Sequence, residues 1–269
     1  MKTVMSKDGT KIVYDKIGNG PSLILVGGAF SYRKFPGMVK LAKLLSDQFT
    51  VYNYDRRGRG DSGDTVFYEP AREYEDLDAM ISEAGGVSYV WGLSSGAVLA
   101  LQAAAYGASI TKLALHEPPF IVNDTDHVPP SDFSKKVSEL IADDRSADTI
   151  KYFMTKGMGA PSFIVTMMRM MPGVWSNLMA VAHTLPYDAA LLEGYMEGKS
   201  LPEDLWNNVT VPTLVLKGTE SPLMLRDGAD ALVKVLPNAE LISKKGLGHT
   251  KQLNVKSISS ELISFFSAV

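Results

Sequence analysis

A sharp turn between a predicted strand and a predicted helix limits the folds that this sequence can adopt. The residues Gly92-Leu93-Ser94-Ser95-Gly96 follow an apolar strand pattern at 87–91 and precede a helical pattern of small residues at 96–106. Glycines on both sides of Ser94 let strand and helix approach closely, and a Gly-x-Ser-x-Gly pattern in this context typically exposes the serine oxygen above a sheet. The start of the helix also favours negative charge beside it. The turn therefore makes Ser94 a candidate nucleophile.

The rest of the chain alternates strand and helix patterns, which predicts right-handed crossovers in an α/β fold. A turn at 7–10 separates two short alternating runs, as in an antiparallel hairpin at a sheet edge. The continuous apolar run at 22–26 predicts a strand buried on both faces. Strands are expected at 2–6, 11–16, 22–26, 50–54, 87–91, 112–116, 212–216 and 240–243, and helices at 38–45, 71–84, 96–106, 225–236 and 257–266.

From 120 to 206 the patterns are helical only, with segments at 131–142, 147–154 and 189–196. We therefore expect a core made of 1–119 and 207–269, and a helical cap at 120–206.

The apolar stretch 163–182 is interrupted by charged and helix-breaking residues, which favours helices facing a pocket over a membrane span. Methionine suits an adaptable apolar pocket, although ordinary helix packing explains each one equally well. The methionines in question are Met154, Met158, Met167, Met168, Met170, Met171 and Met179.

A serine hydroxyl becomes a good nucleophile only when a base removes its proton. The chain has four histidines. His249 lies in Gly246-Leu247-Gly248-His249, between the last strand and the last helix, where an open sheet brings a side chain back to the strand ends. The order serine before histidine favours His249 over His116, His127 and His183.

Four segments together resemble the α/β-hydrolase superfamily: the strand exit 26–30, the turn 54–62, the turn around Ser94, and 246–249. The resemblance covers about 10–119 and 207–269. It implies a mostly parallel eight-stranded sheet flanked by helices, an inserted all-helical cap, and a Ser-His-acid triad at the strand ends. The basic turn 55–61 is similar to a packed family turn stabilised by Arg–Asp hydrogen bonds, and it lacks the lysine pattern of a phosphate-binding loop.

Two positions depart from the family pattern. Gly27-Gly28 stands where the family usually carries His-Gly. The oxyanion donors are backbone N–H groups, so Ala29 or Phe30 can act together with Ser95.

The second departure is Ser221, which occupies the usual place of the triad aspartate and cannot balance an imidazolium charge. Two carboxylates are candidates for that role, Glu117 and Glu220. We favour Glu117, because two prolines fix it at a strand end facing the site.

These residues predict a hydrolase of an ester, lactone or similar activated acyl bond in a small apolar substrate. A C–C bond hydrolase or a cofactor-free perhydrolase would use the same residues, and a ligand-binding pseudoenzyme or receptor-like protein is the alternative from another class.

No metal or cofactor is expected. A net charge of −3 gives no basic field for nucleic acid, and we expect no membrane partner. The absence of cysteine and the charged N-terminal residues favour a cytoplasmic protein; oligomeric state is not predicted.

Overall fold

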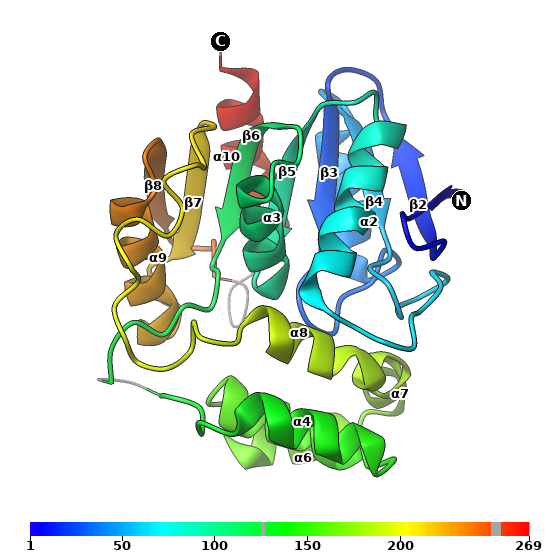
Figure 1. Cartoon of the computed structure of the whole chain (residues 1–269), viewed down its shortest axis with the longest axis vertical. Helices are drawn as coiled ribbons and strands as arrows, with labels where there is room; N and C mark the ends of the chain where they lie inside the picture. The colour runs from blue at the N-terminus through cyan, green and yellow to red at the C-terminus, as the bar shows by residue number, and fades with distance from the viewer. Residues whose placement is uncertain (125–126, 249–253, 269) are drawn as a thin grey trace.

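The computed structural model describes residues 1–124, 127–248 and 254–268. Its centre is an eight-stranded sheet with the order β1-β2-β4-β3-β5-β6-β7-β8, which confirms the predicted fold (Figure 1). β2 pairs antiparallel with β1 and β4, and the remaining pairs are parallel. The strands are β1 (Lys2–Met5), β2 (Lys11–Ile17), β3 (Ser22–Val26), β4 (Thr50–Tyr54), β5 (Ser88–Leu93), β6 (Ile110–His116), β7 (Thr213–Gly218) and β8 (Ala239–Lys244).

Helices cover both faces of the sheet and divide the core into two layers. Successive side chains of a strand point to opposite faces, so Leu23 and Leu25 of β3 enter one core while Ile24 and Val26 enter the other. One core packs against α1 (Pro36–Leu45) and α10 (Val255–Ser267). The other packs against α2 (Pro70–Glu83), α3 (Ser95–Ala105) and α9 (Leu223–Val235), which lie together on the near face in Figure 1.

Between β6 and β7 the described residues contain helices and no strand, and these helices lie beyond one end of the sheet (Figure 1). Among them α8 is drawn nearest to the sheet, and α4 and α6 lie farther out. The segments are α4 (Phe133–Ala142), α5 (Ser146–Tyr152), the π-helical turn η1 (Phe153–Gly157), α6 (Ser162–Arg169), α7 (Pro172–Val181), the 3₁₀ turn η2 (Ala182–Thr184) and α8 (Leu185–Leu191).

Two expectations about these helices were wrong. The helix predicted at 189–196 begins at Leu185 and ends at Leu191. Pro186 suits the first turn of a helix, and Gly194 adopts a φ of 82° just after the helix ends. The stretch 163–182 contributes no residue to the cavity that Ser94 lines. α6, α7 and the turn between them form an outer layer, and Met167 and Met170 are 58% and 78% exposed. In the described part of the chain, no helix combines the length and apolar character that a membrane span requires.

Candidate active site

Ser94 lies at the junction between β5 and α3, in a conformation that few non-glycine residues adopt. Its φ and ψ are 55° and −125°, and its N–H donates a hydrogen bond to the His116 carbonyl at 2.9 Å. A Cβ atom on Gly92 would lie 2.4 Å from the Gly96 carbonyl oxygen, and one on Gly96 would lie 2.5 Å from that of Val26. Both positions therefore require glycine, because the helix turns back against the ends of two strands.

Ser94 lines a cavity of about 230 Å³. Side chains from the sheet ends and the inserted helices form its walls, including Phe30, Leu93, Phe153 and Leu192. Among the described lining residues none is charged, and only Ser31, Ser94 and Ser95 carry hydroxyl groups. Of the seven methionines singled out in the sequence, Met158 alone lines the cavity, because the others pack among the helices or face outward. The cavity suits a small apolar molecule.

The loop that leaves β3 lies directly against Ser94. A Cβ atom on Gly28 would be 3.0 Å from the Ser94 Cβ and 2.7 Å from the Leu93 carbonyl oxygen, so only glycine fits there. The next two residues, Ala29 and Phe30, line the cavity, and Phe30 has a φ of 61°. Within the described residues, the N–H groups of Ala29, Phe30 and Ser95 have no acceptor. The structure thus brings the candidate oxyanion donors, Ser95 with Ala29 or Phe30, to the surroundings of Ser94.

The two candidate acids lie in different environments. Glu117 directly follows β6, is fully buried, and accepts a hydrogen bond on Oε1 from the Gly218 N–H at 2.8 Å. Glu220 has a side chain that is 44% exposed and lies 3.2 Å from Lys245 Nζ. Ser221, at the usual place of the family aspartate, is buried, and its hydroxyl has no hydrogen-bond partner among the described residues.

The predicted base, His249, lies outside the described residues. The last described residue before it, Gly248, packs against the end of β7: a Cβ atom on Gly218 would lie 2.4 Å from the Gly248 nitrogen. The Gly218 N–H is the group that Glu117 binds, so the Glu117 carboxylate lies beside the loop that leads to residue 249.

The three other histidines do not line the cavity. His116 is buried and donates from Nε2 to the Leu247 carbonyl. His127 donates from its ring to the Lys156 carbonyl at 2.6 Å, and His183 Nε2 lies 3.8 Å from Asp64. Their positions leave His249 as the candidate base.

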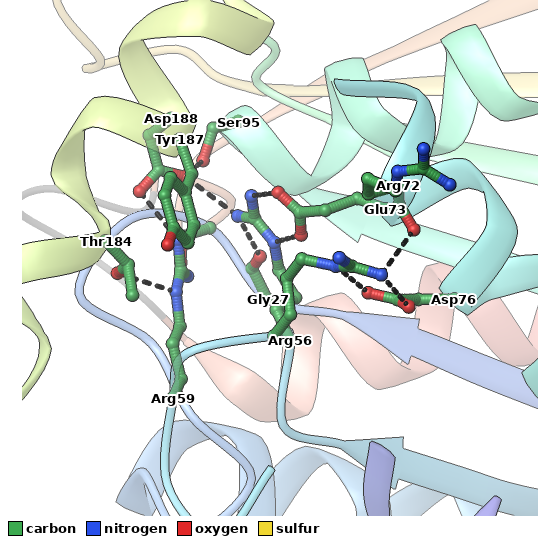
Figure 2. A network of polar contacts seen from close by, with 12 residues as sticks. Gly27, Arg56, Arg59, Arg72, Glu73, Asp76, Ser95, Thr184, Tyr187 and Asp188 are labelled. Atoms are coloured by element: carbon green, nitrogen blue, oxygen red, sulfur yellow. Dashed lines mark hydrogen bonds and ion pairs between the residues drawn. The ribbon is translucent and has the colours of Figure 1, made fainter. Parts of the chain in front are cut away.

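The arginine-rich turn after β4 is packed inside the protein, as the sequence predicts. Arg56 binds both carboxylate oxygens of Glu73 at 2.5 and 2.6 Å (Figure 2). Arg57 binds both carboxylate oxygens of Asp76 at 2.7 Å. All three arginines of the turn are almost completely buried, and each guanidinium is paired with at least one carboxylate. The turn is therefore a structural ion-pair network and leaves no open arginine cluster for a phosphate.

Asp188 of α8 is a buried residue of this network that the sequence analysis missed. Its Oδ1 accepts from Arg56 and from the Ser95 hydroxyl, at 2.8 and 2.7 Å, and its Oδ2 accepts from Arg59 at 2.6 Å (Figure 2). Burial acts to raise the pKa of Asp188, but the charges of Arg59 and Arg56 outweigh it and hold the pKa below its usual value. One feature of the sequence could have indicated it. Asp188 is the single acidic residue in the apolar segment 185–191, and the arginines of the packed turn need acidic partners.

Known proteins share this fold. Residues 23–254 match the model of a family described as alpha/beta hydrolase. An alpha/beta hydrolase from Sphaerobacter thermophilus is 43% identical, with a TM-score of 0.90, and the match covers 99% of this chain and 100% of that one. An esterase from Rhodococcus is 19% identical, with a TM-score of 0.71 and coverage of 99% and 98%. An enol-lactonase from Burkholderia xenovorans is 17% identical, with a TM-score of 0.71 and coverage of 99% and 100%. The last two likenesses show the fold alone. The chain belongs to the alpha/beta hydrolase family.

Proposed function

We propose that the protein is a serine hydrolase that cleaves an ester, lactone or similarly activated acyl bond in a small apolar molecule. The observation that carries the proposal is the position of Ser94, held at a φ of 55° in the wall of a cavity whose described lining is uncharged. A strained junction of this kind costs stability, and such strain clusters at functional sites. The apolar lining favours substrates whose groups around the scissile bond are hydrocarbon.

The proposed reaction begins with attack of Ser94 Oγ on the acyl carbon. His249 takes the hydroxyl proton and delivers it to the leaving alcohol, and the acyl group stays on Ser94. Water then attacks the acyl-serine, gives its proton to His249, and releases the carboxylic acid as the proton returns to Ser94. The N–H groups of Ser95 and Ala29 or Phe30 stabilise the oxyanion in both steps.

We assign Glu117 as the residue that orients His249 and balances its charge. Its carboxylate is buried beside the loop that leads to residue 249, and a charge interacts more strongly there than in water. Glu220 is exposed and paired with Lys245, which weakens any interaction with a histidine at the strand ends.

A panel of p-nitrophenyl esters with acyl chains of increasing length tests the proposal. Wild-type protein should hydrolyse at least one ester, and Ser94→Ala should lower kcat by about 10³-fold or more. Ser259→Ala is the matched control, since the one hydrogen bond of this buried hydroxyl among the described residues goes to the Lys256 carbonyl of its own helix, at 2.9 Å; kcat should stay within twofold. Turnover that survives in Ser94→Ala would contradict the proposal. Binding of apolar ligands without turnover by the wild type would instead favour a receptor-like protein.

A further inference from the structure

The carboxylate of Asp188 connects the inserted helices with both backbone segments beside Ser94. α8 contributes Asp188, whose side chain is fully buried, and among the described residues its carboxylate binds Arg56, Arg59 and Ser95 of the core. Figure 2 shows this carboxylate in contact with both Ser95 and Arg59. Each of its two oxygens leads to a different predicted oxyanion donor.

The first oxygen holds the start of α3. Oδ1 accepts the Ser95 hydroxyl at 2.7 Å and Arg56 Nη1 at 2.8 Å. Ser95 directly follows Ser94, and its backbone N–H is the predicted donor on the helix side. A hydroxyl bonded to an ionised carboxylate forms a strong, directional contact, so this bond restrains the orientation of Ser95.

The second oxygen holds the loop that leaves β3. Oδ2 accepts Arg59 Nη2 at 2.6 Å, and Nη1 of the same guanidinium donates to the Gly28 carbonyl at 2.7 Å. Because a guanidinium is planar and rigid, the position of Asp188 sets the direction in which Arg59 meets Gly28. The chain has no cis peptide bond among the described residues, so the Ala29 N–H points opposite to the Gly28 carbonyl and away from Arg59.

We propose that Asp188 is a positioning residue, which fixes both oxyanion donors when α8 packs on the core. The inference rests on the proposed function. A buried ion network is by itself weak evidence for stability, because desolvation offsets much of its attraction. The geometry supplies a second reason for this network, since the carboxylate aligns peptide groups on both sides of Ser94 in advance of the reaction.

The test compares Asp188→Asn with Asp76→Asn. Asp76 is a matched control, because it is also a buried carboxylate that binds a buried arginine, but its described contacts do not include the loop after β3 or Ser95. Burial raises the pKa of Asp76 to about 6, and bonds from Arg57 oppose this rise, so assays at pH 8 keep both wild-type carboxylates ionised. Circular dichroism and thermal unfolding identify conditions under which each variant is folded.

Three quantities are measured at pH 8. They are kcat and KM for the best p-nitrophenyl ester, and the inhibition constant of a trifluoromethyl ketone that carries the same acyl group as that ester. The ketone forms a tetrahedral adduct whose oxyanion needs the same donors. For Asp188→Asn we expect kcat to fall about 10- to 100-fold and KM to change less than threefold. The inhibition constant should rise by about the same factor as kcat falls. Asp76→Asn should keep kcat and the inhibition constant within threefold.

Ser95→Ala keeps the test decisive if Asp188→Asn does not fold, because it removes only one hydroxyl. We expect kcat to fall at least fivefold in Ser95→Ala, with a matching rise in the inhibition constant. A folded Asp188→Asn protein with kcat and inhibition constant within threefold of wild type would overturn the inference, as would equal losses in Asp76→Asn. If Asp188→Asn does not fold, Ser95→Ala values within twofold of wild type would overturn it. A wild-type protein that neither turns over esters nor binds the ketone would overturn the proposed function, and the inference with it.

Discussion

Replacement of Glu117 by glutamine removes the proposed triad charge with little change in shape. Glu117 is fully buried, and its Oε1 accepts the Gly218 N–H at 2.8 Å. A glutamine carbonyl can accept the same hydrogen bond, so the loop between β7 and α9 keeps its anchor. The negative charge that balances a protonated His249 is lost. A change of this kind lowers kcat by about 10⁴-fold in serine hydrolases, which corresponds to about 5.5 kcal/mol in the activation free energy.

The matched variant is Glu220→Gln, and kcat is measured for both with the best p-nitrophenyl ester. Glu220 is 44% exposed and forms an ion pair with Lys245 at the surface. Such a pair contributes about 0–1 kcal/mol to stability, so Glu220→Gln should leave kcat within twofold. Urea unfolding shows whether either variant has lost its fold. A larger loss of kcat in Glu220→Gln, or equal mild losses in both, would refute the assignment of Glu117.

Three further outcomes follow from the structure. Gly96→Ala should destabilise the protein by about 1–3 kcal/mol in urea unfolding, because its Cβ would lie 2.5 Å from the Val26 carbonyl oxygen; wild-type stability would contradict this. Met158→Trp narrows the cavity and should lower the ratio of octanoate to acetate hydrolysis about tenfold or more; an unchanged ratio would place the acyl chain elsewhere. Asp188→Asn should lower stability by about 3 kcal/mol at pH 6–8. Because Asp188 has a lowered pKa when folded, its contribution is complete above its unfolded pKa of 3.8 and is lost as the pH falls through the folded value, so the Tm difference should shrink below about pH 4. A constant difference down to pH 2.5 would contradict that pKa.

The local features of the fold were predictable because each depends on residues close together in the sequence. The apolar run at 22–26 and the glycines around Ser94 predict a strand and a sharp turn, and the structure has both. Gly92 is required by a contact within the turn itself, because a Cβ atom there would lie 2.4 Å from the Gly96 carbonyl oxygen. Glu117 was predicted at a strand end for the same reason, because it directly follows the apolar pattern at 112–116 and precedes two prolines.

The features that the sequence did not predict depend on contacts between distant segments. Asp188 binds Arg56 and Arg59 across more than 120 positions, and nothing near Asp188 in the chain indicates those partners. The outward orientation of Met167 and Met170 depends on which side of α6 and α7 packs against the other inserted helices. Helical periodicity identifies an apolar stripe, but it does not say whether that stripe faces a cavity, a neighbouring helix or solvent.

Covalent labelling shows whether Ser94 is the nucleophile. A serine-directed fluorophosphonate is incubated with the wild-type protein, and the modified residue is identified by mass spectrometry of the peptides. We predict one equivalent of label on Ser94, lost in Ser94→Ala and slowed in Glu117→Gln, with ester turnover decreasing in proportion to the labelled fraction. Absence of label on Ser94, or full ester turnover by protein that is completely labelled there, would contradict the assignment of Ser94 as the nucleophile.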